Sequence, residues 1–321
     1  MSQNESMIAE AIDRILADAK TGSPGADAAT WRTLADAGVL RLLRPEAEGG
    51  AGPAWRDAAE VLQAAGRHGA TVGLADALVA HALLSQAGIE PGDDAPIRLI
   101  VHGPDGAPDP LTEAHVGMPL AEGSHRLTLS AWGSAVTGQW QPAQGALQQS
   151  IALPDAQQVR AMLAVAGAAV LTGAMRRAFD LTLQWTGTRV QFGRPISQFQ
   201  AVQHALALAA EEIAASRAAL DWAAGELEAG RPMPSAAMAK ARAAEAAGKV
   251  AAITHQAHGA IGFTAEYELF RYTRLLWLWR ERWGNEHTWQ VMLGQAALAG
   301  GGANLFDLVI GEPAQAAHMP G

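Results

Sequence analysis

The chain has 321 residues, of which 49% are hydrophobic and 17% charged, and it contains 34 Gly, 16 Pro and no Cys. This composition is typical of soluble globular proteins of two or three domains, and it excludes disordered, collagen-like and disulfide-stapled proteins. Without cysteine the chain has no thiolate nucleophile, zinc ribbon or iron–sulfur cluster, so any redox chemistry requires a bound organic cofactor. The formal charge of -9 repels phosphate polyanions and disfavours nucleic-acid binding.

Neither the N-terminus nor the interior predicts a membrane segment. Residues 1–20 mix charged side chains such as Glu5 and Arg14 with apolar ones, whereas a signal peptide needs a basic start and an unbroken apolar stretch. The longest weakly polar run, 161–175, is shorter than the ~20 apolar residues that span a bilayer. We therefore expect a cytoplasmic protein with no membrane partner, in which 161–175 forms a buried helix.

The first 90 residues have the pattern of amphipathic helices. Apolar residues recur at spacings of three and four in two stripes, which run through Met7, Ile8, Ile12, Ile15 and Leu16 and then through Trp31, Leu34 and Val39. Gly and Pro interrupt the pattern at 21–25 and 45–53. The sequence therefore predicts an N-terminal helical domain over residues 1–90.

Between residues 91 and 155 the texture changes to short segments separated by prolines. The segments 97–101, 126–137 and 146–153 are strand candidates, and apolar residues occupy every second position in the later two. This alternation is typical of half-buried antiparallel strands. We predict a small antiparallel β domain over 91–155.

Helical signals return from residue 156 to the C-terminal end at 321, which we predict to be a third, helical-bundle domain. A heptad stripe marks a long helix that ends at Gly230: Leu206, Ile213, Leu220 and Leu227. Such a stripe is typical of a core or a subunit interface. An Ala-rich helix beginning after Ser235 would form a helical hairpin with the first, within a four-helix bundle.

Standard catalytic motifs are absent from the sequence. It has no Gly-x-x-x-x-Gly-Lys loop, no His-Glu-x-x-His and no dinucleotide fingerprint between a strand and a helix. His255 and His258 are three residues apart in a predicted helix, but no carboxylate stands at a matching position. We therefore expect no metal site there.

Two segments of the third domain stand out together. The first, 188–203, reads TRVQFGRPISQFQAVQ, and the second, 255–267, reads HQAHGAIGFTAEY. This pair resembles the acyl-CoA dehydrogenase family, which has Arg-x-x-Phe-Gly-x-Pro-Ile entering a helix, then Gln/His-x-x-Gly-x-x-Gly-Phe/Tyr-Thr-x-Glu-Tyr and a later Arg, here Arg274. The N-terminal segments 31–40 and 45–50 are also similar to that family, so the resemblance covers both helical domains.

The resemblance implies a mainly α fold of three domains with a small, here shortened, middle β domain, and it implies FAD as cofactor. Arg189 would reach the FAD pyrophosphate of a neighbouring subunit, since a guanidinium suits bidentate phosphate contact. Gln256 and Gly259 would approach the adenine-diphosphate half, with His255 and His258 packed or near the flavin edge. The full set of cofactor-binding residues implied is Arg189, Gln191, Phe192, Gln200, Gln256 and Gly259.

The family's catalytic base is missing at both positions that usually host it. A Glu removes the α-proton of the acyl thioester while hydride leaves the β-carbon for the flavin. Alignment by the motifs places Trp283 at the first position and Leu163 at the second, and neither side chain accepts a proton. Glu281 and Glu286 flank Trp283, but a shift of two or three residues re-aims a carboxylate.

These departures leave three functional hypotheses. The first is a supporting subunit that holds the FAD of a catalytic family member in a heterotetramer, acting on an acyl-CoA in lipid metabolism. The second is a homomeric acyl-CoA dehydrogenase whose base is Glu281 or Glu286, and the third is a scaffold without flavin. Four tryptophans surround the base position and would either fill a defunct pocket or stack on a ring substrate: Trp277, Trp279, Trp283 and Trp289.

Overall fold

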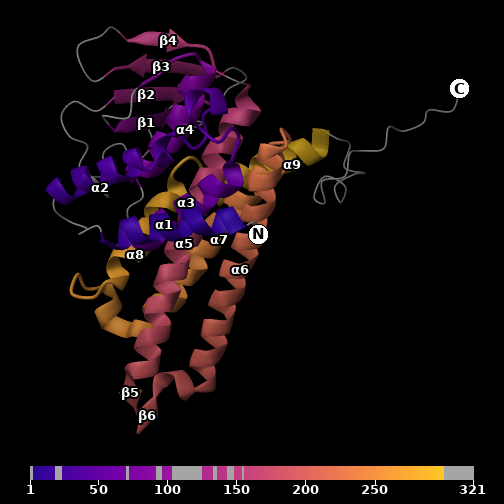
Figure 1. Ribbon diagram of the computed structural model, residues 1–321. Helices are drawn as coiled ribbons and strands as arrows, with labels where there is room; N and C mark the ends of the chain where they lie inside the picture. Colours follow the sequence, from indigo (N-terminus) through magenta and orange to yellow (C-terminus); the bar gives the residue numbers. More distant parts are fainter. Residues whose placement is uncertain are drawn as a thin grey trace, which may run out of the picture.

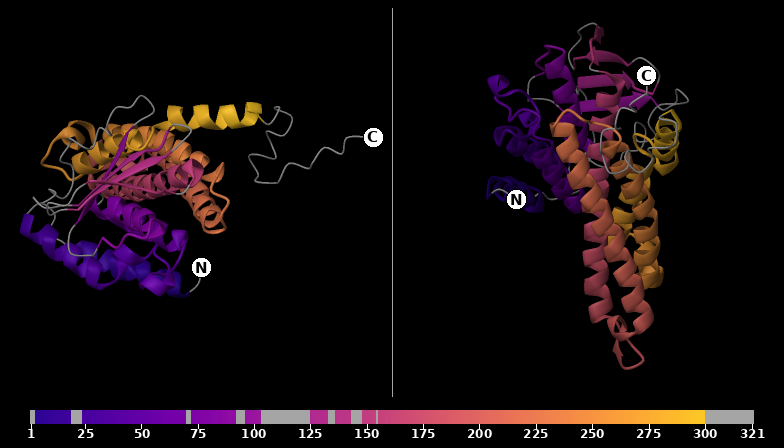
Figure 2. Two further views of the ribbon diagram at one scale, coloured as in Figure 1. Left: turned by 90° about the horizontal axis from the view of Figure 1, so that it is seen from above. Right: turned by 90° about the vertical axis from the view of Figure 1, so that its right-hand side faces the viewer.

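The protein is mainly helical, with a four-stranded sheet at one end of the molecule and a short hairpin at the other (Figure 1). The computed structural model describes residues 3–18, 24–69, 72–91, 96–102, 125–132, 136–142, 148–153 and 155–299. Three long helices, α5 to α7, run away from the sheet, and the N-terminal helices cover one side of them while α8 and α9 lie on the other (Figure 2). This is the fold class that the sequence predicts.

The N-terminal helices are α1 (Gln3–Asp18), α2 (Pro24–Asp36), α3 (Trp55–His68) and α4 (Val72–Gln86). Of the predicted stripes, Ile12, Leu16, Trp31 and Leu34 are buried in the core, while the side chains of Met7 and Ile8 lie outside the described part of the structure. Burial of each such side chain stabilises the fold by ~1.5–3 kcal/mol. Helix α4 packs against the sheet and is buried along most of its length, including its polar residues Asp76 and His81, as expected of a helix enclosed in a core.

The sheet has four strands in sequence order: β1 (Ile97–His102), β2 (His125–Ser130), β3 (Thr137–Gln141) and β4 (Gln149–Ile151). Alternate residues of β1 and β2, such as Leu99 and Leu127, are buried. The period-two pattern found in the sequence therefore does place one face of the sheet against the helices.

Two predictions for this region are wrong. The sheet is mixed rather than antiparallel, because β1 and β2 pair in parallel while β2–β3 and β3–β4 are antiparallel. The predicted strand 126–137 is not continuous, because β2 ends at Ser130 and β3 begins only at Thr137. After β2, Trp132 packs edge-on against Trp289, with ring centroids 5.2 Å apart.

Helix α5 (Ala156–Thr188) is the centre of the bundle and packs against α3, α6, α7 and α8. It begins at Asp155, whose carboxylate accepts a hydrogen bond from the Gln157 N–H at 2.8 Å, a standard N-cap. Its most apolar stretch is long enough to cross a membrane, but 89% of that window is buried inside the protein. The run 161–175 is thus a buried core helix, as predicted.

Helices α3 and α5 approach closely at two glycines. A Cβ on Gly66 would lie 2.3 Å from the Val170 carbonyl oxygen, and a Cβ on Gly173 would lie 1.9 Å from the Gln63 carbonyl oxygen. Both distances are far below van der Waals contact, so the two backbones touch where side chains are missing.

The remaining helices are α6 (Gln200–Glu228), α7 (Ser235–His258), α8 (Leu269–Glu281) and α9 (Glu286–Ala299). Helix α6 is the predicted long helix, and α6 with α7 forms the predicted hairpin. Of its heptad stripe, Leu206, Leu220 and Leu227 are buried and Ile213 is partly buried, so the stripe belongs to the core. The domain boundaries at 90 and 155 stay predictions, and residues 300–321 of the third predicted domain lie outside the described residues.

Candidate functional site

A short hairpin closes the end of the bundle farthest from the sheet (Figure 1). Its strands are β5 (Val190–Gln191) and β6 (Arg194–Pro195), joined by Phe192 and Gly193 with φ of 50° and 81°. Two consecutive positive φ angles are typical of the tight hairpin turns that match strand twist. A non-glycine residue with φ > 0 is uncommon, and Phe192 is also 92% exposed, so strain and exposure coincide at this turn.

Aromatic contacts bring the two sequence motifs together at this end. The Arg189 guanidinium carbon lies 5.9 Å from the centroid of the Trp185 ring, and that ring stacks on His258 at 5.4 Å. Tyr267 packs against both rings. Arg189 of the first motif is therefore fixed beside the end of α7, which carries the second motif. We call Arg189–Gly193 with Gln256–Phe263 the bundle tip.

The predicted cofactor residues are all exposed on this part of the protein: Arg189, Gln191, Phe192, Gln200, Gln256 and Gly259. Gly259 ends α7 with φ 68° and ψ -147°, a conformation that essentially only glycine adopts. A Cβ built there would meet nothing within 4 Å. The structure thus explains this glycine by backbone conformation and leaves open space above it.

The two histidines of the second motif pack rather than project into solvent. The His258 Nδ1–H donates a hydrogen bond to the Thr254 carbonyl oxygen at 2.8 Å, and His255 stacks on Phe263 with ring centroids 3.9 Å apart. Burial lowers the pKa of both imidazoles, which keeps them neutral at pH 7. In the part of the chain that the structure describes, no group of three or more His, Asp or Glu could hold a metal ion.

A second region of interest is the turn between α8 and α9, Arg282–Asn285, which we call the α8–α9 turn. Trp283, at the aligned base position, is 3% exposed and has φ 57°, and Gly284 follows with φ 88°. A Cβ on Gly284 would lie 2.9 Å from both Trp132 and Trp289. The turn is therefore tightly enclosed by aromatic side chains.

Lys240 of α7 holds the α8–α9 turn in place through hydrogen bonds to the backbone. Its ammonium group donates to the carbonyl oxygens of Trp279 and Arg280 at 3.1 Å and of Gly284 at 2.9 Å, and the side chain is fully buried. These are carbonyls at and beyond the last turn of α8, where a positive charge is favourable. Gly167 of α5 makes room for the lysine, because a Cβ there would approach it to 2.9 Å.

Arg282 anchors the same turn on its other side. Its guanidinium carbon lies 4.7 Å and 4.5 Å from the ring centroids of Trp279 and Trp283. The guanidinium also pairs with Asp76 of α4, and both side chains are buried. A planar cation that contacts the faces of two indole rings is a stable arrangement. The space beside the base position is thus filled by packed side chains.

The two neighbouring carboxylates have partners elsewhere. Glu286 accepts from the Arg280 Nε at 2.9 Å, and that hydrogen bond lowers the pKa of the Glu286 carboxyl. Glu281 is half exposed and accepts from the Asn285 side chain at 2.9 Å. At the second base position, Leu163 is fully buried in α5.

The prediction that four tryptophans surround the base position is partly wrong. Trp279, Trp283 and Trp289 are buried, and the Trp289 indole donates to the Trp283 carbonyl at 3.1 Å. Trp277 is 46% exposed, because it lies on the outer face of α8, where Arg280 stacks on it at 5.6 Å. The remaining three fill the protein interior beside the turn.

Comparison with known proteins places these features in a family. Residues 156–280 match the family model described as "Acyl-CoA dehydrogenase, C-terminal domain". The chain is 32% identical over 264 residues to the acyl-CoA dehydrogenase IpdE2 of Mycolicibacterium smegmatis, covering 77% of this chain and 81% of that protein. The chain belongs to the acyl-CoA dehydrogenase family.

Other relatives agree with this assignment. The IpdE2 acyl-CoA dehydrogenase of Mycobacterium tuberculosis is 31% identical over 272 residues, covering 77% of this chain and 80% of that protein. The ChsE4-ChsE5 complex from Mycobacterium tuberculosis superposes with a TM-score of 0.74 at 21% identity, covering 93% of this chain and 98% of that chain. The steroid ACAD Tcur3481-Tcur3483 gives a TM-score of 0.74 at 24% identity, covering 94% and 99%. The acyl-CoA dehydrogenase fold predicted from the motifs is confirmed.

The sequence did not reveal the residues that enclose the α8–α9 turn. Lys240, Asp76 and Arg282 carry no motif, although a lysine among the alanines of a buried helix face is a signal that could have been noticed. The roles of Arg189, Gln191, Phe192, Gln200, Gln256 and Gly259 in an acyl-CoA dehydrogenase cofactor site stay predictions.

Proposed function

We propose that this chain is a supporting subunit of an FAD-dependent acyl-CoA dehydrogenase, in which a second family member carries the catalytic base. The observation that carries the proposal is the α8–α9 turn. Trp283 occupies the base position, is buried, and is enclosed by Lys240 and by the Arg282–Asp76 pair. Neither an acyl thioester nor a carboxylate has room at that position.

The bundle tip supports a role in holding the cofactor. A guanidinium oriented by Trp185, exposed amide groups and an open glycine form a donor set that fits a diphosphate and an adenine ring. Bound FAD supplies the hydride acceptor for α,β-desaturation of an acyl-CoA thioester. In this chain Arg189 would bind the pyrophosphate, Gln191, Gln200 and Gln256 would hydrogen-bond beside it, and Phe192 would cover an apolar face of the cofactor.

The position of the bundle tip favours binding of the cofactor that a neighbouring subunit holds. The β5–β6 hairpin lies at the end of the bundle opposite the sheet (Figure 1), and Arg189 comes directly before it while Phe192 is in its turn. The α8–α9 turn instead packs against Trp132, next to the sheet, so one molecule does not bring its tip to its own base position. One of the solved structures that this chain resembles is a complex, that of ChsE4 with ChsE5. We infer a similar assembly here, with this chain paired to a catalytic family member.

In a homomeric enzyme, Glu281 or Glu286 would have to act as the catalytic base. The contacts of both carboxylates instead favour a supporting role for this chain. Glu286 is held by Arg280, and this hydrogen bond lowers the pKa of its carboxyl, which makes it a weaker base. Glu281 is on the surface beside Asn285. Neither shares the buried environment of Trp283.

The visible absorbance and the native mass of the purified chain test the proposal. The chain is expressed alone and together with a family member encoded beside it. Flavin absorbance only in a mixed assembly, with activity that survives Glu281→Gln and Glu286→Gln in this chain, is the expected result. One FAD for each chain in a homogeneous, active preparation would overturn the proposal in favour of a homomeric enzyme. A mixed or single preparation that never holds flavin would favour the scaffold.

A further inference from the structure

A cavity of about 430 Å³ lies between α3, α5 and α6, away from both regions described above. Its volume is within the ~300–1,000 Å³ typical of small-molecule sites. The lining residues that matter for its chemistry are Gln63, Arg67, Arg176, Phe179, Ile213 and Arg217. None of its described lining residues belongs to the bundle tip or to the α8–α9 turn, so the proposed function makes no use of it.

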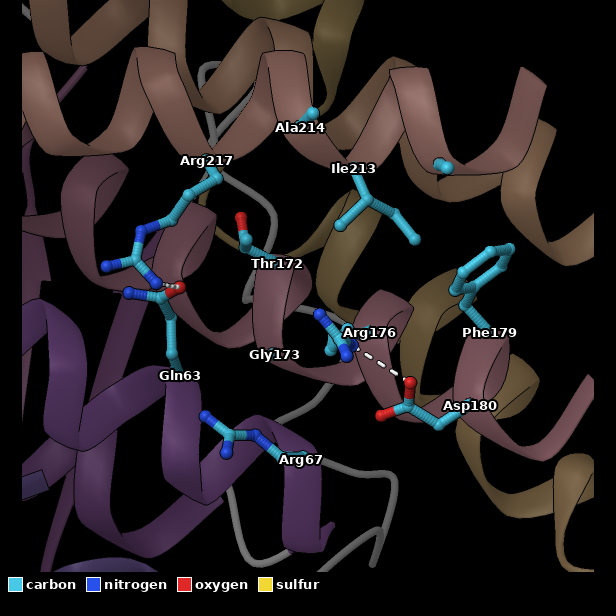
Figure 3. A pocket seen from close by; sticks show the side chains of 11 residues that line it. Gln63, Arg67, Thr172, Gly173, Arg176, Phe179, Asp180, Ile213, Ala214 and Arg217 are labelled. Carbon is cyan, nitrogen blue, oxygen red and sulfur yellow. Dashed lines mark hydrogen bonds and ion pairs between the residues drawn. The ribbon is translucent and has the colours of Figure 1, made fainter. Parts of the chain in front are cut away.

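The cavity has a part lined by arginines and their carboxylate partners, among them Asp180, and an apolar part. Figure 3 shows Arg67 and Arg217 at one end, Phe179 at the other end, and Arg176 between them. Ile213 and Ala214 of α6 complete the apolar wall. A ligand that fits both parts carries an anionic group and a compact apolar body.

Each guanidinium is held in place by a carboxylate. Arg67 donates to Asp13 at 2.8 Å, Arg176 to Asp180 at 2.9 Å, and Arg217 to Asp221 at 2.7 Å. These ion pairs fix the side chains before any ligand arrives, which lowers the entropy lost on binding. Arg217 also donates to Gln63 and Glu60, so most of its hydrogen-bonding capacity is used within the protein.

Arg67 and Arg176 retain unused donors. The Arg67 Nε is buried and, among the described residues, has no hydrogen-bond acceptor. Arg176 binds Asp180 only through its Nε, and its two terminal amino groups have no acceptor in the described part of the chain. The Arg176 side chain is 62% exposed, so its free amino groups reach solvent, and an incoming carboxylate can bind them in place of water.

We propose that this cavity binds an organic monocarboxylate whose apolar body has about the size of one six-membered ring. Guanidinium forks match the two oxygens of a carboxylate. Four carboxylates, those of Asp13, Glu60, Asp180 and Asp221, contact the three arginines, so the site has no net positive charge and would bind a monoanion better than a phosphate dianion. Phe179 and Ile213 then cover the ring.

Isothermal titration calorimetry with benzoate tests the site on the full-length chain, in the assembly in which it purifies and in a buffer without carboxylate or phosphate. Saturable binding is expected, whereas benzyl alcohol should show none. Arg176→Gln should weaken benzoate binding roughly 10-fold or more, the loss typical of a charged hydrogen bond. The exposed Arg32→Gln on α2 is the matched control and should leave the affinity unchanged.

Phe179→Ala tests the apolar part of the cavity separately from the arginines. It should weaken the binding of benzoate, which has a ring, but not the binding of acetate, which has none. Three results would overturn the proposal. They are the absence of saturable benzoate binding to the unmodified chain, equal binding by Arg176→Gln, and tighter binding of phenyl phosphate than of benzoate. The last result would mean a phosphate site. Because Arg176 is largely exposed, its substitution leaves the fold intact.

Discussion

Asp76 of α4 and Arg282 of the α8–α9 turn form a buried ion pair across 206 positions of sequence. The Nη2–Oδ1 distance is 2.6 Å, and the side chains are 2% and 3% exposed. The second carboxylate oxygen of Asp76 accepts from the Leu99 backbone N–H at 3.3 Å. One pair therefore connects the helix beneath the sheet, the first strand and the turn that carries Trp283.

Asp76→Ala should destabilise the protein by about 3–5 kcal/mol, because it leaves the Arg282 charge buried without its carboxylate. Chemical denaturation would measure the free energy of unfolding. The control is Glu245→Ala, which removes the exposed ion pair with Lys249, and its cost should be at most ~1 kcal/mol. If Asp76→Leu combined with Arg282→Leu is as unstable as Asp76→Ala, the unpaired charge is not the cause.

Lys240→Met should also destabilise the fold, by about 2–4 kcal/mol. The methionine fills the same space beside Gly167 but leaves three carbonyl oxygens, those of Trp279, Arg280 and Gly284, without the charged donor. Lys249→Met is the matched control on the exposed face of the same helix and should have a much smaller effect. Equal unfolding free energies for the two variants would contradict this account.

Stability should fall in mild acid because of His81. This imidazole is buried beside Arg44, which lies 2.6 Å from its Nδ1, and burial with that charge lowers its pKa from 6.5 to about 3. Below pH 6.5 the His81 imidazole is protonated in the unfolded chain but stays neutral in the folded chain. The free energy of unfolding therefore decreases as pH falls, by about 2 kcal/mol between pH 7 and 5.

His81→Gln removes this titration while keeping a hydrogen-bond acceptor for Arg44. The difference in unfolding free energy between the two proteins should change by about 2 kcal/mol between pH 7 and 5 and stay constant between pH 7 and 8. A difference that is independent of pH across the whole range would show that His81 does not cause the acid sensitivity.

Arg189→Gln should weaken FAD retention in the assembled complex roughly 10-fold or more without changing stability, because the side chain is exposed and would lose a charged phosphate contact. Dialysis followed by flavin absorbance gives the retained fraction. Arg194→Gln, on the facing strand of the same hairpin, is the control, since Arg194 packs on Phe199 at 4.3 Å. Unchanged flavin content in Arg189→Gln would remove this residue from the cofactor site.

The parts of this structure that follow from local pattern could be predicted. The heptad spacing of Leu206, Leu220 and Leu227 predicted α6 and its buried face, because helical periodicity is local in sequence. The Asp76–Arg282 pair could not be predicted, since nothing near either residue in sequence indicates a partner 206 positions away. Trp277 was misplaced because proximity in sequence does not fix which face of α8 a side chain occupies.

The missing side chains of Gly66 and Gly173 also limit how this protein could be recombined with its relatives. Each glycine leaves space for a backbone carbonyl of the opposite helix, so α3 and α5 fit only as a matched pair. A chimera that takes residues 24–91 from another family member would need equally small residues at this crossing. Otherwise the graft would force the helices apart and widen the seam along which Gln63, Arg67 and Thr172 face the cavity.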